Sequence, residues 1–481
     1  MRICFIAEGS YPYVTGGVSS WIHSIMNQMT EHEFIIYAIG AESKQKGVYK
    51  YTLPPNVVEI KEIFLDTYLE EEDVKWGKRF KLTAKEQELL YSLLVGDENL
   101  AWDEVFDLLR MKKYERVSDF LSSKDYFDIV EQLCRSAYPL VPFTEMFWTV
   151  RSMILPLLLV VREDIPKADL YHCVSTGYAG VIGTLAKHLT GAPLLLTEHG
   201  IYSREREEEI IKANWVKGYF KDLWIKYFYG LSASIYSAAD QVVTLFNRSK
   251  EIEVELGCDE DKIMIIPNGV KLEDYDNLPS APPDGRFRIG AVVRIVPIKD
   301  IKTMLHSFAL VKQEIPDAEL TIMGPIDEDE VYYKECQQMA NTLQLEDVHF
   351  VGMVQVKDYI GMMDVLLLTS ISEGQPLAVL EGMASGTPCV TTNVGSCQEL
   401  LYGRDDGIGM AGLVAPVMHY EVVAEHIIKL YRDEALRQEM GRNALERVQR
   451  YYRFEDFIAR YRYLYASLGE GGRVWQESVS N

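Results

Sequence analysis

Short apolar runs alternate with segments of helical periodicity over most of this 481-residue chain. The first unit is the clearest: residues 2–7 fit a buried strand, residues 8–17 are a loop ending in two glycines, and apolar residues then recur at helical spacing from Val18 to Met29. Such alternation is typical of βαβ units, in which helices cover a sheet of parallel strands. The pattern therefore predicts an α/β protein with doubly wound parallel sheets.

The predicted strands fall into two series. They are expected at residues 2–7, 34–39, 170–175, 193–198, 241–246 and 263–266, and again at residues 287–294, 319–324, 348–352, 365–370, 388–393 and 413–415. Residues 276–286 between the series concentrate Pro, Gly and Ser, which favours a linker. We therefore expect Rossmann-like domains at residues 1–275 and 285–452, and a helix within 453–481 that packs back toward the first domain.

Residues 65–165 depart from this alternation, because they are acidic, Leu-rich and helical with few strand signals. They predict a helical insertion into the first domain. Residues 145–161 within it are apolar around most of a helix circumference, but they lack the basic polar face of an interfacial helix. A buried core helix is the simpler interpretation. The longest apolar run, residues 153–161, is about half of the roughly 20 residues that a membrane span needs.

Composition excludes several classes of function. With 49 Lys and Arg against 72 Asp and Glu, the formal net charge is -23, which repels nucleic acids and anionic lipids unless basic residues are concentrated locally. Seven scattered cysteines without a C-x-x-C pair indicate reduced thiols. The opening MRICFIA is too short for a secretory signal. We therefore expect a cytoplasmic protein with no nucleic-acid partner.

The most specific signal is the segment from Ser370 to Val390. It places Glu373 after a buried strand, Pro376 in the first turn of the next helix, and Glu381 within that helix. Such a loop offers free backbone N–H groups to an anion, and both carboxylates can accept hydrogen bonds from sugar hydroxyls. The alternative is an acidic helix start that the helix dipole favours.

This segment, with E-G-x-P-x-x-x-x-E followed by A-x-G-x-P-x-V, resembles the signature of family 4 retaining glycosyltransferases with the GT-B fold. Other motifs follow in the family's order, at Pro267–Val270, Val293–Arg294, Lys299–Asp300, Phe350–Gly352 and Val394–Glu399. The opening AEGSYPYVTGGVSSW, the run TEHGIYSRER and the acidic insertion are similar to glycosyltransferases of bacterial Pel exopolysaccharide synthesis. The resemblance implies two Rossmann-like domains facing a cleft, in a cytosolic enzyme held at the inner membrane by an export complex.

The resemblance also implies roles for particular residues. Glu373 would hold hydroxyls of the donor sugar, and Glu381 would bind the ribose diol. Arg294 and Lys299 would grip the diphosphate, and His199 would face the donor sugar. The remaining nucleotide-binding positions would be Gly16, Gly17, Asn268, Met353, Gln375, Pro376 and Leu377.

Four further positions carry weaker signals. Glu198 and Arg204 flank His199 closely enough to touch an acceptor. Ser396 and Glu399 are motif positions, and Glu399 is expected to be a cap or loop anchor.

Asp327-Glu-Asp329 has the D-x-D form that metal-dependent transferases use, but acids before a helix more simply favour its dipole. No metal and no cofactor are therefore expected. The predicted function is transfer of a hexose or N-acetylhexosamine, with retention, from UDP-GalNAc, UDP-GlcNAc or UDP-glucose to a growing polysaccharide. The alternatives are a GT-B nucleotide-sugar epimerase and a non-catalytic UDP-sugar-binding subunit that regulates a membrane polysaccharide synthase.

Overall fold

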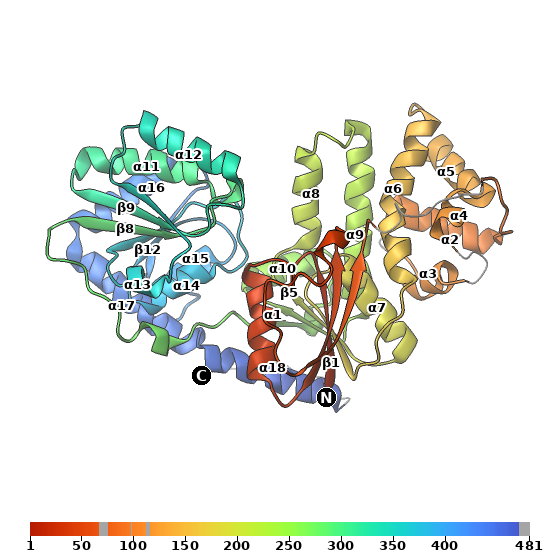
Figure 1. The fold of residues 1–481 in the computed structure, drawn as a ribbon, viewed down its shortest axis with the longest axis horizontal. Helices are drawn as coiled ribbons and strands as arrows, with labels where there is room; N and C mark the ends of the chain where they lie inside the picture. Colours follow the sequence, from red (N-terminus) through yellow and green to blue (C-terminus); the bar gives the residue numbers. More distant parts are fainter. Residues whose placement is uncertain (67–75, 98, 112–115, 471–481) are drawn as a thin grey trace. The chain divides into compact units, whose positions relative to one another are not determined.

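The computed structural model describes residues 1–66, 76–97, 99–111 and 116–470. The predicted insertion and the predicted C-terminal segment therefore extend partly outside the described residues. The chain divides into two compact units (Figure 1). Unit 1 contains residues 1–244, 249–265 and those from 461 onward, and unit 2 contains residues 245–248 and 266–460.

The sheet of unit 1 is parallel throughout, with the strand order β3-β2-β1-β4-β5-β6-β7. Its strands are β1 (Arg2–Glu8), β2 (Glu33–Gly40), β3 (Val57–Phe64), β4 (Leu170–Cys173), β5 (Leu194–Glu198), β6 (Gln241–Thr244) and β7 (Ile263–Ile265). The hydrophobic pattern does not predict β3, because this half-exposed edge strand carries Glu59, Lys61 and Glu62 in its centre. The other strands match the predicted ones within two residues at each end.

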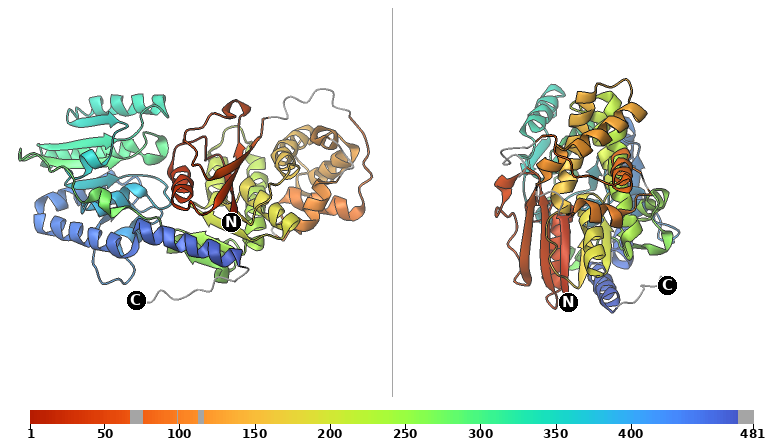
Figure 2. Two further views of the ribbon diagram at one scale, coloured as in Figure 1. Left: turned by 60° about the horizontal axis from the view of Figure 1, so that its bottom comes forward. Right: turned by 90° about the vertical axis from the view of Figure 1, so that its right-hand side faces the viewer.

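Helices cover both faces of this sheet, with α1 and α7 on opposite sides (Figures 1 and 2). The helices that follow the strands of unit 1 are α1 (Gly17–Gln28), α7 (Tyr178–Thr190), α8 (Tyr202–Lys212), α9 (Lys221–Ala238) and α10 (Asn247–Glu255). The insertion is helical where the structure describes it, with α2 (Ala84–Val95), α3 (Trp102–Leu109), α4 (Val117–Leu121), α5 (Lys124–Ala137) and α6 (Phe143–Val161).

Helix α6 is the apolar helix that the sequence predicts, and its burial is confirmed. It packs against α3, α4, α5 and α7, and its buried side chains belong to the hydrophobic core of unit 1. By length and hydropathy alone α6 would qualify as a membrane span, but more than half of its apolar window is buried inside the protein. That burial is the property of a core helix.

The sheet of unit 2 is also parallel, with the order β10-β9-β8-β11-β12-β13. Its strands are β8 (Phe287–Val292), β9 (Ala318–Met323), β10 (Val348–Gly352), β11 (Val365–Leu368), β12 (Cys389–Thr392) and β13 (Gly412–Ala415). In each sheet the strand order reverses beside the first strand of its series, as in doubly wound folds. The predicted fold class, GT-B with two Rossmann-like domains and a helical insertion in the first, is confirmed.

In Figure 1, α11 and α12 lie on one side of the second sheet, and α14 and α17 lie on the other. The helices of unit 2 are α11 (Ile301–Glu314), α12 (Glu330–Thr342), α13 (Lys357–Ile360), α14 (Leu377–Ala384), α15 (Cys397–Tyr402), α16 (Tyr420–Arg432) and α17 (Glu434–Tyr451). The last helix, α18 (Phe454–Gly469), begins in unit 2 and belongs to unit 1 from Tyr461 onward. It is therefore shared between the two units.

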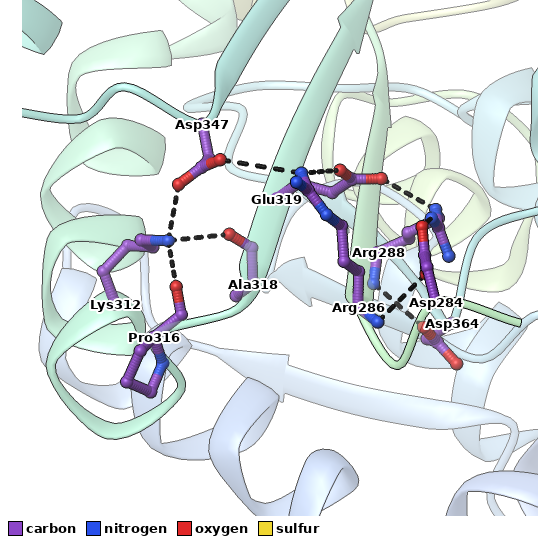
Figure 3. Close-up of polar contacts among 9 residues, drawn as sticks. All are labelled: Asp284, Arg286, Arg288, Lys312, Pro316, Ala318, Glu319, Asp347 and Asp364. Atoms are coloured by element: carbon purple, nitrogen blue, oxygen red, sulfur yellow. Dashed lines mark hydrogen bonds and ion pairs between the residues drawn. The ribbon is translucent and has the colours of Figure 1, made fainter. Parts of the chain in front are cut away.

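The amino ends of β8, β9 and β10 are joined by ion pairs (Figure 3). Arg288 on β8 contacts Glu319 on β9 with 2.7 Å between Nε and Oε1, and Arg286 contacts the same carboxylate at 3.0 Å. Lys312 at the end of α11 contacts Asp347, which precedes β10, at 2.7 Å. Ligands of doubly wound sheets bind at the carboxyl ends of the strands. This network therefore stabilises the edge of the sheet opposite the one where a ligand is expected.

The seven cysteines are buried and free, as the sequence predicts. Burial raises the pKa of the Cys336 thiol to about 11, so this group is a neutral thiol at physiological pH.

Candidate functional site

At the carboxyl edge of the second sheet, the loops that follow β8 and β11 are bound to each other. The Thr369 hydroxyl donates toward the carbonyl oxygens of Lys299 and Asp300, at 3.2 and 3.0 Å. The N–H of Ile371 donates to the carbonyl oxygen of Ile298 at 2.9 Å. These bonds fix the two loops relative to each other, so the relative positions of the side chains that they carry are also fixed.

Glu373 and Lys299 form an ion pair at this edge. The distance from Lys299 Nζ to Glu373 Oε1 is 2.5 Å, and the Ser370 hydroxyl donates to the same oxygen at 2.6 Å. Only 15% of the Lys299 side chain and 11% of the Glu373 side chain are exposed, so solvent screens their charges little. A cation and a carboxylate held side by side suit a ligand that has both anionic oxygens and hydroxyl groups.

A sharp turn at Gly395 supports the Glu373 loop. Gly395 has φ +51°, and a Cβ atom there would lie 2.0 Å from the carbonyl oxygen of Gly374 and 2.4 Å from that of Glu373. The N–H of Ser396 also donates to the Gly374 carbonyl at 2.9 Å. Glycine is required at position 395 both by the backbone conformation and by the close approach. The V-G-S motif therefore shapes the loop that carries Glu373.

The predicted binding positions Asn268 and Gln375 contact each other. Gln375 Oε1 accepts a hydrogen bond from the backbone N–H of Asn268 at 2.6 Å, and both residues are buried. This bond holds the start of the 375–377 segment. Pro376 is the residue immediately before α14 and Leu377 is the first residue of that helix, whose first N–H groups have no intrahelical acceptors. The structure thus gives Gln375 a supporting role and presents the backbone of Leu377 at a helix start.

Glu381 lies one turn into α14 and is largely shielded from water. Burial raises the pKa of its carboxyl group to about 7. Among the described residues, no side chain forms an ion pair or hydrogen bond with this carboxylate. A shielded carboxylate without a partner is suited to accept two O–H groups from a vicinal diol.

The raised pKa of Glu381 predicts a pH dependence of ligand binding. Two O–H donors bind the ionised carboxylate better than the neutral acid, so UDP-glucose affinity should rise as the pH rises through about 7. We expect about tenfold weaker binding at pH 6 than at pH 8, because about a tenth of the group is ionised one pH unit below its pKa. Titration calorimetry measures this, and Glu381→Gln should give weak binding with a flat pH profile. An equally steep profile in the variant would contradict the assignment.

The predicted diphosphate-binding Arg294 follows β8 and is paired with Glu328. The distance from Arg294 Nη1 to Glu328 Oε2 is 2.9 Å, and 44% of the arginine side chain is exposed. Nearby, Gly352 ends β10 with φ +72°, and Met353 follows it with 74% of its side chain exposed. Arg294 is thus available to solvent, but a carboxylate competes for it.

Removing the Glu328 carboxylate, which competes with phosphate for Arg294, should strengthen nucleotide binding. An exposed ion pair contributes at most about 1 kcal/mol, so Glu328→Gln should raise UDP affinity by roughly two- to fivefold. Calorimetry with UDP measures the change. Glu330→Gln is a matched control, because it removes a carboxylate two residues away that pairs instead with Lys334. Equal gains in both variants would indicate a general charge effect and contradict a role for Arg294.

In unit 1, the predicted glycines lie at the start of α1. Gly17 is the first residue of the helix, Gly16 precedes it in an extended conformation, and a Cβ atom on either would meet nothing within 4 Å. Neither position requires glycine for its own fold. The space above both is open, so a ligand can approach the backbone there.

His199 follows β5 at the carboxyl edge of the first sheet. Its ring packs edge-to-face on Trp21, with 4.8 Å between the centroids. Burial lowers the pKa of His199 to about 4, so the imidazole is neutral at physiological pH. Its Nε2 atom is buried without a hydrogen-bond partner among the residues that the structure describes. A buried polar atom of this kind is available for a ligand group.

The expectation that Glu198 touches an acceptor is wrong. Its carboxylate is buried and accepts hydrogen bonds from the Tyr236 hydroxyl at 2.6 Å and from the Thr176 hydroxyl at 3.3 Å. Burial raises the pKa of Glu198 above its ordinary value. Arg204 is engaged at the surface with Glu255 at 3.0 Å. Both residues therefore have local partners that account for them.

The anchor role predicted for Glu399 is confirmed. Its carboxylate accepts hydrogen bonds from the backbone N–H and the side-chain amide of Asn247, at 3.1 and 2.9 Å. Asp329 is likewise the cap of α12 that the sequence predicts, since it accepts the N–H of Tyr332 at 2.9 Å. Within the described ranges, no group of three or more His, Cys, Asp or Glu side chains could hold a metal ion.

Three residues support the predicted site residues in roles that the motifs alone do not predict. Ser370 and Thr369 hold Glu373 and Lys299 in place, and Trp21 packs on His199. Ser370 opens the quoted motif, so its position offers a sequence signal. Trp21 closes the quoted opening segment, but nothing in the sequence pairs it with His199, because their contact joins segments that are distant in the sequence.

Comparison with known protein families gives two matches. Residues 1–261 match the family described as Domain of unknown function (DUF3492), and residues 278–447 match the one described as Glycosyl transferases group 1. The second match contains Glu373, Glu381, Arg294 and Lys299.

Two relatives are similar in sequence. N-acetyl-alpha-D-glucosaminyl L-malate synthase of Bacillus anthracis is 32% identical over 170 residues, which are 35% of this chain and 42% of that protein. The UDP-Gal:alpha-D-GlcNAc-diphosphoundecaprenol alpha-1,3-galactosyltransferase of Escherichia coli is 26% identical over 327 residues, which are 63% of this chain and 76% of that protein. The chain thus spans less than half of the first relative and about three quarters of the second.

Solved structures resemble the fold over nearly the whole chain. Sucrose-phosphate synthase from Thermosynechococcus elongatus has a TM-score of 0.61 at 15% identity and covers 98% of this chain and 100% of its own. Anabaena HepE in complex with UDP has a TM-score of 0.61 at 15% identity and covers 97% of this chain and 100% of its own. At this level of identity the likeness shows a shared fold.

Proposed function

The chain belongs to the DUF3492 family and carries a glycosyltransferase group 1 domain, and from this we propose that it transfers a hexose or N-acetylhexosamine from a UDP-sugar to a growing polysaccharide. The donor would be UDP-GalNAc, UDP-GlcNAc or UDP-glucose. The observation that carries the proposal is the shielded ion pair between Lys299 and Glu373 at the carboxyl edge of the second sheet.

In this proposal Lys299 and Arg294 stabilise the negative charge that develops on the departing diphosphate. Ligand binding would exchange the carboxylate partners of these two cations for phosphate oxygens, which releases Glu373 toward sugar hydroxyls. Glu381 binds the ribose diol of the nucleotide. The backbone N–H groups at the start of α14 add donors for an anion.

The transfer would retain the configuration of the sugar. The bond between the anomeric carbon and the diphosphate oxygen breaks, a bond to the acceptor oxygen forms on the same face, and the acceptor proton passes to the departing phosphate. His199, neutral and with an unsatisfied Nε2, would orient the donor sugar. No metal ion would be needed, because lysine and arginine supply the positive charge.

Relatives with related donors support this choice. The E. coli relative is named for UDP-Gal, and HepE has been solved with UDP and with UDP-glucose. We further propose a role like that of PelF in Pel exopolysaccharide synthesis, as the opening segment and TEHGIYSRER motif favour. The protein would then be cytoplasmic and peripheral to the inner membrane through an export complex.

The deciding experiment measures UDP release from UDP-glucose, UDP-GlcNAc and UDP-GalNAc, with and without oligosaccharide acceptors, in EDTA. Acceptor-dependent UDP release with one donor is the expected result. Conversion of the donor without any acceptor would indicate an epimerase. UDP binding without turnover of any donor would indicate a regulatory subunit. Loss of activity in EDTA would contradict the metal-free mechanism and would indicate that Asp327 is a metal ligand.

A further inference from the structure

Trp21 of α1 lies at the centre of a group of buried rings in unit 1. Its ring is in edge-to-face contact with His199, His172 and Tyr461, with centroid distances of 4.8, 5.6 and 5.2 Å. Phe5 on β1 adds a fourth edge-to-face contact at 6.1 Å. Edge-to-face packing favours particular ring orientations in addition to burying area. The orientation of the His199 ring therefore depends on where Trp21 is held.

A chain of hydrogen bonds fixes the far side of this ring group. The Tyr465 hydroxyl bonds His172 Nδ1 at 2.8 Å, His172 Nε2 bonds the Thr197 hydroxyl at 2.8 Å, and that hydroxyl bonds the Tyr461 hydroxyl at 3.0 Å. Burial lowers the pKa of His172 well below its ordinary value, so its ring is neutral, with one nitrogen donating and the other accepting. Tyr461 and Tyr465 thereby bind α18 to β4 and β5.

This chain reaches the strand end that carries His199. Thr197 stands two residues before His199 on the same chain segment. Its hydroxyl forms hydrogen bonds with both His172 Nε2 and the Tyr461 hydroxyl. His199 is thus constrained in two ways: through the backbone by Thr197 and through its ring by Trp21. What its ring lacks is a partner for Nε2 among the described residues.

We propose that Trp21 and Tyr461 are positioning residues for His199, holding its imidazole so that Nε2 remains unpaired until a ligand group bonds it. The inference rests on the proposed function, in which His199 orients the donor sugar. It assigns a role in the reaction to α18, a helix that carries none of the predicted site residues. Leaving a buried nitrogen unpaired costs free energy, and rigid packing on Trp21 prevents the ring from turning to recover that cost.

The test uses the full chain with ¹⁵N-labelled histidine and records the His199 ring resonances, assigned with His199→Gln. Trp21→Phe and Tyr461→Phe should both change the His199 shifts, and Trp21→Phe should also lower kcat by about tenfold with UDP affinity unchanged. Matched controls are Trp102→Phe, which changes a buried tryptophan of α3, and Tyr171→Phe, which loses a part-buried hydrogen bond from its hydroxyl to the Pro166 carbonyl. Both controls should leave the His199 shifts and kcat as in the wild type.

Three outcomes separate the possibilities. Unchanged His199 shifts in Trp21→Phe and Tyr461→Phe would overturn the inference whether or not the chain is active. Equal losses of kcat in the variants and their controls would show a general stability effect and would also overturn it. A wild-type chain that releases no UDP, while the His199 shifts respond as expected, would overturn the proposed function and leave the positioning of His199 standing.

Discussion

Replacing Lys299 with methionine should lower kcat for UDP release by roughly 100-fold or more, the range found when one preorganised charge-stabilising group is removed. The side chain length is kept, so the loss reflects the charge. Lys299 is 15% exposed and faces Glu373 at 2.5 Å, so its removal also leaves Glu373 without its cation in a shielded place. Steady-state kinetics with a saturating donor measures the effect.

Lys302→Met is the matched control for this variant. Lys302 is three residues further along, in α11, and pairs with Glu335 at 2.7 Å, but its side chain is 38% exposed. We expect its replacement to leave kcat within twofold of the wild type. Comparable losses in both variants would show that the effect is not specific to the sheet edge.

Glu373 should respond differently from Lys299. Glu373→Gln keeps the shape of the side chain and removes the charge that pairs with Lys299. Because Lys299 would then be free to bind phosphate, UDP affinity should be unchanged or slightly higher while turnover falls strongly. A parallel loss of affinity and turnover, measured by calorimetry and kinetics, would contradict a role of Glu373 toward the sugar.

The second large effect is expected from Gly395→Ala. A Cβ atom at this position would lie 2.0 Å from the Gly374 carbonyl oxygen, and the backbone has φ +51°. The alanine variant must move the Glu373 loop or the 395–396 turn, and a misplacement of about 1 Å costs on the order of 100-fold in rate. We expect turnover to fall by about that factor, while the circular dichroism spectrum shows that the variant is still folded.

Gly407→Ala separates backbone strain from displacement of the loop. Gly407 has φ +71°, but a Cβ atom there would meet nothing within 4 Å. This control should lose about 1 kcal/mol of stability from the left-handed backbone while retaining its turnover. If Gly407→Ala were as inactive as Gly395→Ala, the contact with the Glu373 loop would not be the cause.

The fold was accessible from sequence because buried parallel strands are short apolar runs that recur with intervening helices. β8 and β11 could be placed within two residues for this reason, and among the strands in the described residues only the charged edge strand β3 escapes the pattern. The pairing of Lys299 with Glu373 could not be predicted from the sequence. Spacing can place both residues at one edge of a sheet, but it does not give the loop conformations that bring them to 2.5 Å.

Side chains near a motif were the least predictable. Glu198 stands beside His199 in the sequence, yet alternation along a strand directs neighbouring side chains to opposite faces. Glu198 therefore points into the core toward Tyr236, whereas His199 packs on Trp21. The pairing of Arg294 with Glu328 could not be predicted either. Glu328 stands in an acidic run before α12, and such a run is already explained by its interaction with the helix start.

The sharing of α18 has a consequence for biosynthesis. Unit 1 contains residues 1–244, but Tyr461 and Tyr465, which complete its packing, follow the second sheet in the chain. Until Tyr465 is synthesised, His172 Nδ1 lacks the hydroxyl that bonds it in the folded chain. Domains usually complete folding in the order of synthesis. Unit 1 instead needs residues that follow the whole of the second sheet, so its packing can be completed only after unit 2 has been synthesised.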